Sequence, residues 1–157
     1  MRTLDHLQLI LAAAGKYAGT GVNHAAEAFT GNLELRVPEG GNAALLRYVA
    51  TRSDGRHLHA ETGLIACDAS GELCLWPAME EMPHLLAHRL IARDDTPAGA
   101  TRFVFSSGNP DDRTSFREQI ALEIEAGRGI VMYRHRWGLP AGEFDERSWC
   151  RFARREG

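Results

Sequence analysis

The sequence lacks several features that identify common classes of protein. Its three cysteines, Cys67, Cys74 and Cys150, are widely spaced, odd in number and never form a Cys-x-x-Cys pair, which argues against a disulfide framework and a zinc knuckle. The longest apolar run, at 7–14, is far shorter than the roughly 20 residues that cross a bilayer. The start does not follow the basic, apolar, small-residue order of a signal peptide. We therefore expect a cytoplasmic protein with no membrane partner.

A strong excess of one charge is also missing. The chain carries 18 basic and 21 acidic side chains, for a formal net charge of −3. Nucleic-acid binders usually have a strong positive excess that displaces counterions from phosphates, so we expect no nucleic-acid partner. Lys16 is the only lysine, and this uniform use of arginine is explained more simply by codon usage than by function. The Gly-x-Ser-x-Gly, phosphate-loop and His-Glu-x-x-His motifs are all absent.

The pattern that is present is one helix followed by many short strands. The chain has 157 residues, 44% of them hydrophobic, and no linker or repeat, so residues 1–157 are expected to form a single globular domain. Leu7, Leu11 and Ala14 recur at helical spacing before Gly15. Turn residues then separate ten candidate strands: 16–23, 32–37, 43–52, 56–67, 72–77, 85–93, 100–106, 114–124, 129–138 and 147–154. Regularly spaced short strands are typical of an antiparallel barrel or sandwich.

One of these strands, 114–124, has a helical alternative, because Asn109 and Pro110 could start a helix. The alternation of apolar and polar side chains favours a strand. With 126–127 as a two-residue turn, this strand pairs with 129–138 and both apolar faces turn inward. The expected facing pairs are Phe116 with Trp137, Glu118 with His135, Ile120 with Tyr133, and Leu122 with Val131.

The predicted pair of Glu118 and His135 is the most specific site in the pattern. Both side chains lie on an otherwise apolar strand face, and an unpartnered buried charge costs several kcal/mol, so each should find the other or an inward arginine. The pair is either a polar anchor or acid/base couple for a ligand, or a buried pair that only fixes the register. Tyr133 and Trp137 beside it are either core or cavity lining.

A second polar group lies on the hairpin formed by 43–52 and 56–67 around the turn at 54–55. Neither face of this hairpin is cleanly apolar, as expected for a sheet beside a wet ligand cavity. His57, His59 and Glu61 alternate along one strand and so point the same way. They could hold a divalent metal if another strand added a histidine, although solvent-facing or pocket side chains are the simpler reading.

Two segments resemble a known family. Residues 15–21, Gly-Lys-Tyr-Ala-Gly-Thr-Gly, resemble the Gly-x-Trp-x-Gly-x-Gly opening of calycin-type barrels, in particular the nitrobindin-like and fatty-acid-binding-protein-like group. Residues 58–64, Leu-His-Ala-Glu-Thr-Gly-Leu, are similar to that group's Leu-His-x-Glu-x-Gly run. The resemblance implies a mainly β protein: an up-and-down, lipocalin-like antiparallel barrel of about ten strands with a short N-terminal helix. It also implies that Tyr17 plugs the barrel floor.

The last strand departs from the family in its polar residues. Haem-binding members carry an iron-ligating histidine there, whereas 147–152 contains none, so we expect no cofactor. Cys150 is the remaining iron ligand in this segment, although a buried small side chain is the simpler reading. Fatty-acid-binding proteins hold a carboxylate with an arginine and a tyrosine in the last strand, and Arg151 or Arg154 matches only the arginine.

These observations lead to three hypotheses. The first is a barrel that binds, without catalysis, an amphipathic or anionic small molecule lined by Glu118, Tyr133, His135 and Trp137, with Arg151 as an anion contact. The second is a haem or metal enzyme of nitrobindin type. The third is an interaction module with a packed interior that forms a homodimer through an exposed strand.

Overall fold

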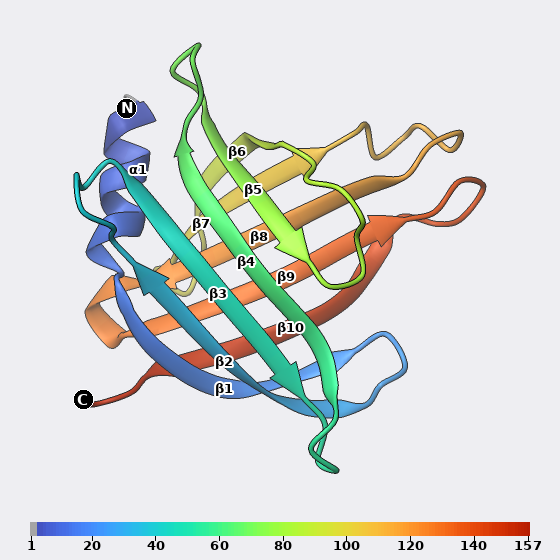
Figure 1. Cartoon of the computed structure of the whole chain (residues 1–157), viewed down its shortest axis with the longest axis horizontal. Coiled ribbons are helices and arrows are strands. Elements are labelled where there is room, and N and C mark those ends of the chain that lie inside the picture. The colour runs from blue at the N-terminus through green and yellow to red at the C-terminus, as the bar shows by residue number, and fades with distance from the viewer. Residues whose placement is uncertain (1–2) are drawn as a thin grey trace.

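Alternation of buried and exposed residues runs along β2 (Ala28–Arg36) and the second half of β10 (Asp145–Arg154), as expected for strands with one face on a core. The computed structural model describes residues 3–157. Its strands are antiparallel and close into a barrel in the order β1-β10-β9-β8-β7-β6-β5-β4-β3-β2, so the last strand pairs with the first (Figure 1). The predicted ten-stranded calycin-like barrel with a short N-terminal helix is confirmed.

The predicted elements all exist, and the largest boundary error is at β2, which begins at Ala28 instead of residue 32. The segment predicted as a strand at 114–124, for which a helix was the alternative, does form a strand, which begins at Arg117 and ends at Glu125. The remaining elements are α1 (Thr3–Ala12), β1 (Gly15–Asn23), β3 (Ala43–Thr51), β4 (His57–Cys67), β5 (Leu73–Met79), β6 (His88–Asp95), β7 (Thr101–Ser107), β8 (Arg117–Glu125), a 3-10 turn (Ala126–Arg128) and β9 (Ile130–Gly138).

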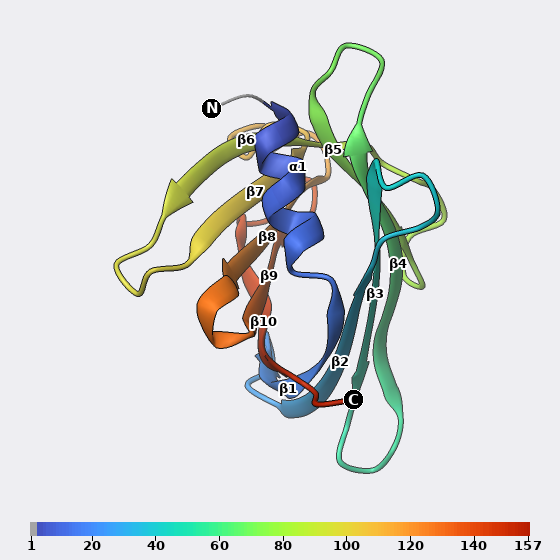
Figure 2. The same cartoon turned by 90° about the vertical axis from the view of Figure 1, so that its left-hand side faces the viewer.

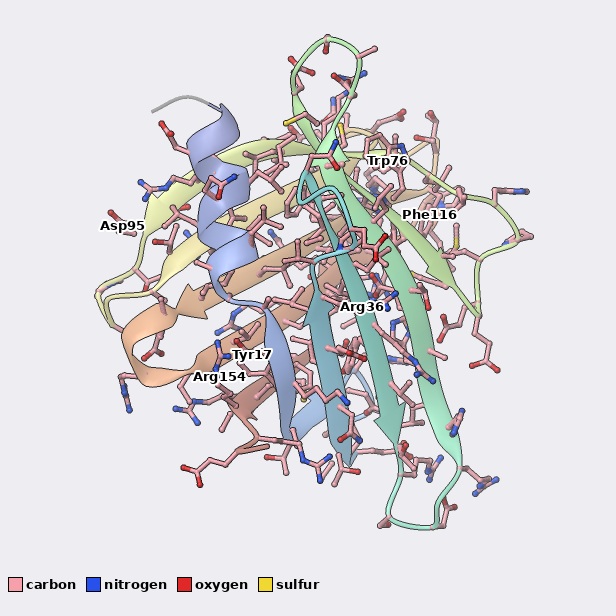
Figure 3. All side chains as sticks on the ribbon, turned by 60° about the vertical axis from the view of Figure 1, so that its left-hand side comes forward. Tyr17, Arg36, Trp76, Asp95, Phe116 and Arg154 are labelled. Atoms are coloured by element: carbon pink, nitrogen blue, oxygen red, sulfur yellow. The ribbon has the colours of Figure 1, made fainter. Side chains whose placement is uncertain are left out.

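Helix α1 covers one end of the barrel (Figure 2) and packs on β3, β4 and β5. Leu7 and Ile10 are buried on its inner face, and Ala13, directly after the helix, is buried as well. Tyr17, also buried, lies just after the helix, and its hydroxyl donates to the Ala13 carbonyl at 2.5 Å. Arg154 from the last strand lies over the Tyr17 ring, 5.2 Å from its centroid (Figure 3). The aromatic of the glycine-rich motif therefore helps to close this end, as the resemblance implied.

Two glycines of that motif allow β1 to meet β10. A Cβ atom on Gly19 would lie 1.8 Å from the Arg151 carbonyl oxygen, and one on Gly21 would lie 2.1 Å from the Trp149 carbonyl oxygen. No side chain fits at such distances, so closure of the barrel depends on glycine at both positions.

The hairpin of β8 and β9 has a different register from the one predicted. A four-residue loop, 126–129, replaces the two-residue turn, and Gly129 takes the left-handed conformation at its end, with φ of 61°. Glu118 therefore faces Trp137, and Ile120 faces His135, a shift of two positions on β9. Because the shift is even, the same side chains still point inward. The predicted cross-strand pairs were therefore wrong, whereas the side chains predicted to point into the barrel do so.

The hairpin of β3 and β4 has the predicted register from Leu45–Leu64 to Ala50–His59. A bulge after Ala50 then places Thr51 opposite His57, where Leu58 was expected.

Within residues 3–157, no helix is long and apolar enough to span a membrane.

Candidate functional site

A cavity of about 410 Å³ lies inside the barrel at the end opposite α1. Its walls come from the β1–β2 turn and from the parts of β3, β4, β5, β8, β9 and β10 that lie farthest from the helix. Most of the lining is apolar, and the aromatic and aliphatic members include Phe29, Leu58, Met79, Met82, Phe116, Trp137 and Leu139. Polar side chains from β4, β8 and β9 break this apolar wall.

Glu118 on β8 is the centre of the first polar group. It is 2% exposed and receives hydrogen bonds from Nε2 of His88 on β6, at 2.6 Å, and from Nε2 of His135 on β9, at 2.8 Å. Burial alone would raise the pKa of Glu118, but the hydrogen bonds from His135 and His88 outweigh it and lower the pKa to about 2. The carboxylate is therefore ionised at neutral pH although it is almost out of contact with water.

His88 is held at both ring nitrogens. Its Nδ1 lies 2.8 Å from the Leu86 carbonyl oxygen, and its Nε2 lies against Glu118. A carbonyl and an ionised carboxylate can only accept hydrogen bonds, so each nitrogen must carry a proton. His88 is thus an imidazolium that neutralises Glu118.

Glu61 on β4 is the centre of the second polar group. Its Oε2 accepts the Tyr133 hydroxyl at 2.5 Å and Nε2 of His59 at 3.2 Å, while Nδ1 of His59 reaches Glu81 at 3.0 Å. Burial acts against a charge on His59, but the hydrogen bonds to Glu61 and Glu81 outweigh it and raise its pKa to about 9. Burial also raises the pKa of Tyr133, so its hydroxyl remains a donor.

His135 differs from the other two histidines because one of its nitrogens is free. Nε2 donates to Glu118, whereas Nδ1 has no hydrogen-bond partner among residues 3–157. The side chain is 13% exposed and lines the cavity. Its ring centroid is 6.1 Å from that of His59 and 6.3 Å from that of Tyr133. The two polar groups therefore meet at His135.

Four of the five predicted ligand residues line this cavity: Glu118, Tyr133, His135 and Trp137. Arg151 does not, because it is exposed and alternates on β10 with the buried Cys150 and Phe152. The expectation that it contacts an anion inside the barrel is wrong.

Arg147 is the arginine at the cavity, and the sequence reasoning did not select it. A bulge between Glu146 and Ser148 interrupts the alternation on β10 at this residue. Its guanidinium carbon lies 4.3 Å from the centroid of the Trp137 ring, and Nε donates to the Trp137 carbonyl at 3.1 Å. Because of this bulge, simple alternation along the strand could not predict that Arg147 lines the cavity.

The candidate metal ligands do not form one group. His57 is exposed, whereas His59 and Glu61 bond to each other and to Glu81 and Tyr133. In the described part of the chain, no three His, Cys, Asp or Glu side chains are placed to hold a metal ion.

An iron ligand is not available on β10 either. Cys150 has no exposed surface, and burial raises the pKa of its thiol to about 12, so it is neither accessible nor a thiolate. The residues present do not fit the last-strand haem ligation that the resemblance suggested.

Comparison with known proteins identifies the fold. Neither protein-family models nor curated sequences give a match. Among solved structures, the crystal structure of Rv2717c from M. tuberculosis is similar, with a TM-score of 0.75 and 14% sequence identity over 96% of this chain and 97% of that one. At this identity the likeness shows the barrel fold alone, which is consistent with a calycin-like protein.

Proposed function

We propose that this protein binds a small amphipathic molecule inside the barrel. The observation that carries the proposal is the cavity itself: about 410 Å³ with mainly apolar walls and a few polar groups, among them Nδ1 of His135, which has no partner within residues 3–157. Sites for small molecules have this size and this combination of apolar lining with a few polar groups. A barrel that served only as a packed interaction module would not need an open interior.

The charges indicate how such a molecule is oriented. Glu118 is neutralised by His88, and His59 lies between Glu61 and Glu81, so the inner part of the cavity has no uncompensated positive charge. Nδ1 of His135 accepts a hydrogen bond, which favours a hydroxyl or N–H on the ligand. An acidic group on the ligand would instead lie toward Arg147, whose Nη1 makes no hydrogen bond within residues 3–157.

Two fluorescent probes that differ by one sulfonate test this proposal. N-phenyl-1-naphthylamine is neutral and carries an N–H donor, and 8-anilinonaphthalene-1-sulfonate is its sulfonated analogue. We expect both to saturate one site and to change Trp137 fluorescence. Arg147→Gln should weaken binding of the sulfonate by about fivefold, since one favourable charge contact is worth about 1 kcal/mol, and leave binding of the neutral probe unchanged.

A filled cavity supplies the control. Ala50 is buried and lines the cavity, so Ala50→Trp should abolish binding of both probes. Ala153 is exposed on the outside of β10, so Ala153→Trp should bind as the wild type does. Equal binding to the two tryptophan variants would show that the probes do not enter the barrel, and the proposal would fail.

Two other hypotheses, haem binding and formation of a homodimer, have their own tests. Because β10 offers no accessible ligand, added haem should give no Soret band; a band that disappears in His135→Ala would overturn this expectation. A homodimer is tested by light scattering across a dilution series, where a stable dimer would keep a mass of about twice 17.3 kDa.

A further inference from the structure

The two polar groups at the cavity contain three histidines, His88, His59 and His135, which are bonded in different ways. His88 uses both nitrogens, one on the Leu86 carbonyl and one on Glu118. His59 also uses both, on Glu81 and Glu61. His135 uses only Nε2, on Glu118. Of the three, it alone has a nitrogen available to a molecule in the cavity.

Glu118 fixes which nitrogen of His135 carries the proton. The ionised carboxylate accepts from Nε2, so Nε2 holds a hydrogen, and a second proton on Nδ1 would find no acceptor. The lone pair of Nδ1 therefore faces the cavity. A carboxylate that orients an imidazole from behind, with the opposite nitrogen facing the substrate, is the arrangement of a histidine general base.

The surroundings of His135 support this role. Glu118 from β8, His59 from β4 and Tyr133 from β9 are the titratable groups nearest to its ring, and Ser148 of β10 pairs with its backbone. Glu81, Arg147 and the exposed His24 are the other charged or titratable side chains of the cavity lining. His88 already supplies a positive charge to Glu118, so the carboxylate does not need a second cation.

We propose that His135 is a general base that removes a proton from a weakly acidic carbon of the bound molecule, so that the cavity catalyses proton-transfer isomerisation. This inference rests on the proposed binding function. The Nδ1 lone pair takes the proton, the C–H electron pair forms a π bond to the neighbouring carbon, and the π pair that this carbon shared with an electron-withdrawing atom, such as a carbonyl oxygen, moves onto that atom as negative charge. Arg147, on the same wall, faces the negative charge that develops. Return of the proton to another substrate atom restores His135, and no oxidant or second reactant is consumed.

A neutral carbon acid, 5-nitrobenzisoxazole, tests the proposal. Loss of its C3 proton to Nδ1 forms a nitrile as the N–O bond breaks, and the oxygen leaves as a coloured phenolate; solvent then takes the proton from His135. General bases contribute about 10²- to 10⁴-fold, so His135→Gln should lower kcat/KM at least tenfold.

Controls separate failure of catalysis from failure of binding. His57→Gln makes the same exchange at an exposed position on β4 and should keep the wild-type rate, whereas Ala50→Trp should remove the rate with the cavity. If 5-nitrobenzisoxazole saturates the change in Trp137 fluorescence but the His135→Gln variant reacts as fast as the wild type, the general-base role of His135 is overturned and the binding proposal stands. If the probe neither binds nor reacts, the proposed function and this inference both fail.

Discussion

Two carboxylates, Glu61 and Glu118, lie inside the barrel with side chains that are 0% and 3% exposed. Their energetics differ because their partners differ. Glu118 has both oxygens occupied by imidazole nitrogens, whereas Oε1 of Glu61 has no partner within residues 3–157. Glu118 is therefore the residue whose charge should contribute most clearly to stability.

Acid should remove that contribution. The pKa of Glu118 is lowered from 4.5 to about 2, so its stabilisation is present above pH 4.5 and is lost as the pH falls toward 2. A shift of this size corresponds to about 3 kcal/mol. Urea unfolding between pH 5 and pH 2 should show this loss in the wild type and a shallower slope in Glu118→Gln. Glu143→Gln, at a carboxylate that is 70% exposed, should keep the wild-type slope.

Residue-level contacts were only partly predictable from sequence. Glu118 and His135 lie on one strand face in either register, so alternation alone brought them together. His88 could not be found in this way, because it reaches Glu118 from β6 across 30 positions of sequence. The same holds for Tyr133 and Glu61, which are 72 positions apart. These contacts depend on how the barrel closes, which local patterns do not encode.

At the scale of elements, the contact between β1 and β10 depends on small residues. Gly19→Ala would place a methyl group 1.8 Å from the Arg151 carbonyl, so the two strands would have to separate. We expect it to lower the free energy of unfolding by more than about 3 kcal/mol, as for other severe overpacking. Gly127→Ala, at a loop position with no atom within 4 Å, should change it by less than about 1 kcal/mol. Similar urea midpoints for the two variants would contradict this account of closure.

Arg117 joins the loops at the cavity end. It is 1% exposed and donates to the carbonyls of Pro110, Ser115, Leu139 and Gly142. It thereby links the β7–β8 loop to the β9–β10 loop. Its hydrogen-bond acceptors are all backbone carbonyls, so the sequence offered no charge pair by which to recognise it.

Removing this arginine should loosen both loops. Arg117→Met leaves buried carbonyls without donors, and we expect a loss of more than about 2 kcal/mol together with faster hydrogen exchange at 110–115 and 139–142. Arg113→Met removes a 57% exposed side chain from the same region and should cost less than about 1 kcal/mol. Unchanged exchange in Arg117→Met would show that the loops are held by other contacts.

Hairpin geometry shows what the sequence could and could not predict about elements. The existence of β8 and β9 followed from their alternation, and so did their inward faces. Their exact register depended on whether the chain turned at 126–127 or used the four-residue loop 126–129 with Gly129 in a left-handed conformation. Both turns suit these residues, so tertiary packing decided between them.

At the scale of the whole molecule, the barrel has two different ends. Helix α1 covers one end (Figures 1 and 2), where Arg154 donates a hydrogen bond to the Tyr17 hydroxyl. The cavity occupies the other end. The glycine-rich segment and the number of strands made the closed end and the barrel predictable. The cavity was less so, because its shape depends on the β5–β6 loop and on the bulge at Arg147.

The most direct test of the central claim is a crystal structure of the protein with N-phenyl-1-naphthylamine. We expect the naphthalene ring inside the barrel between Phe29, Met79 and Trp137, with its N–H within hydrogen-bond distance of Nδ1 of His135. A probe bound on the outer face or beside α1, with the cavity unoccupied by it, would contradict the claim that the interior of this barrel is a binding site.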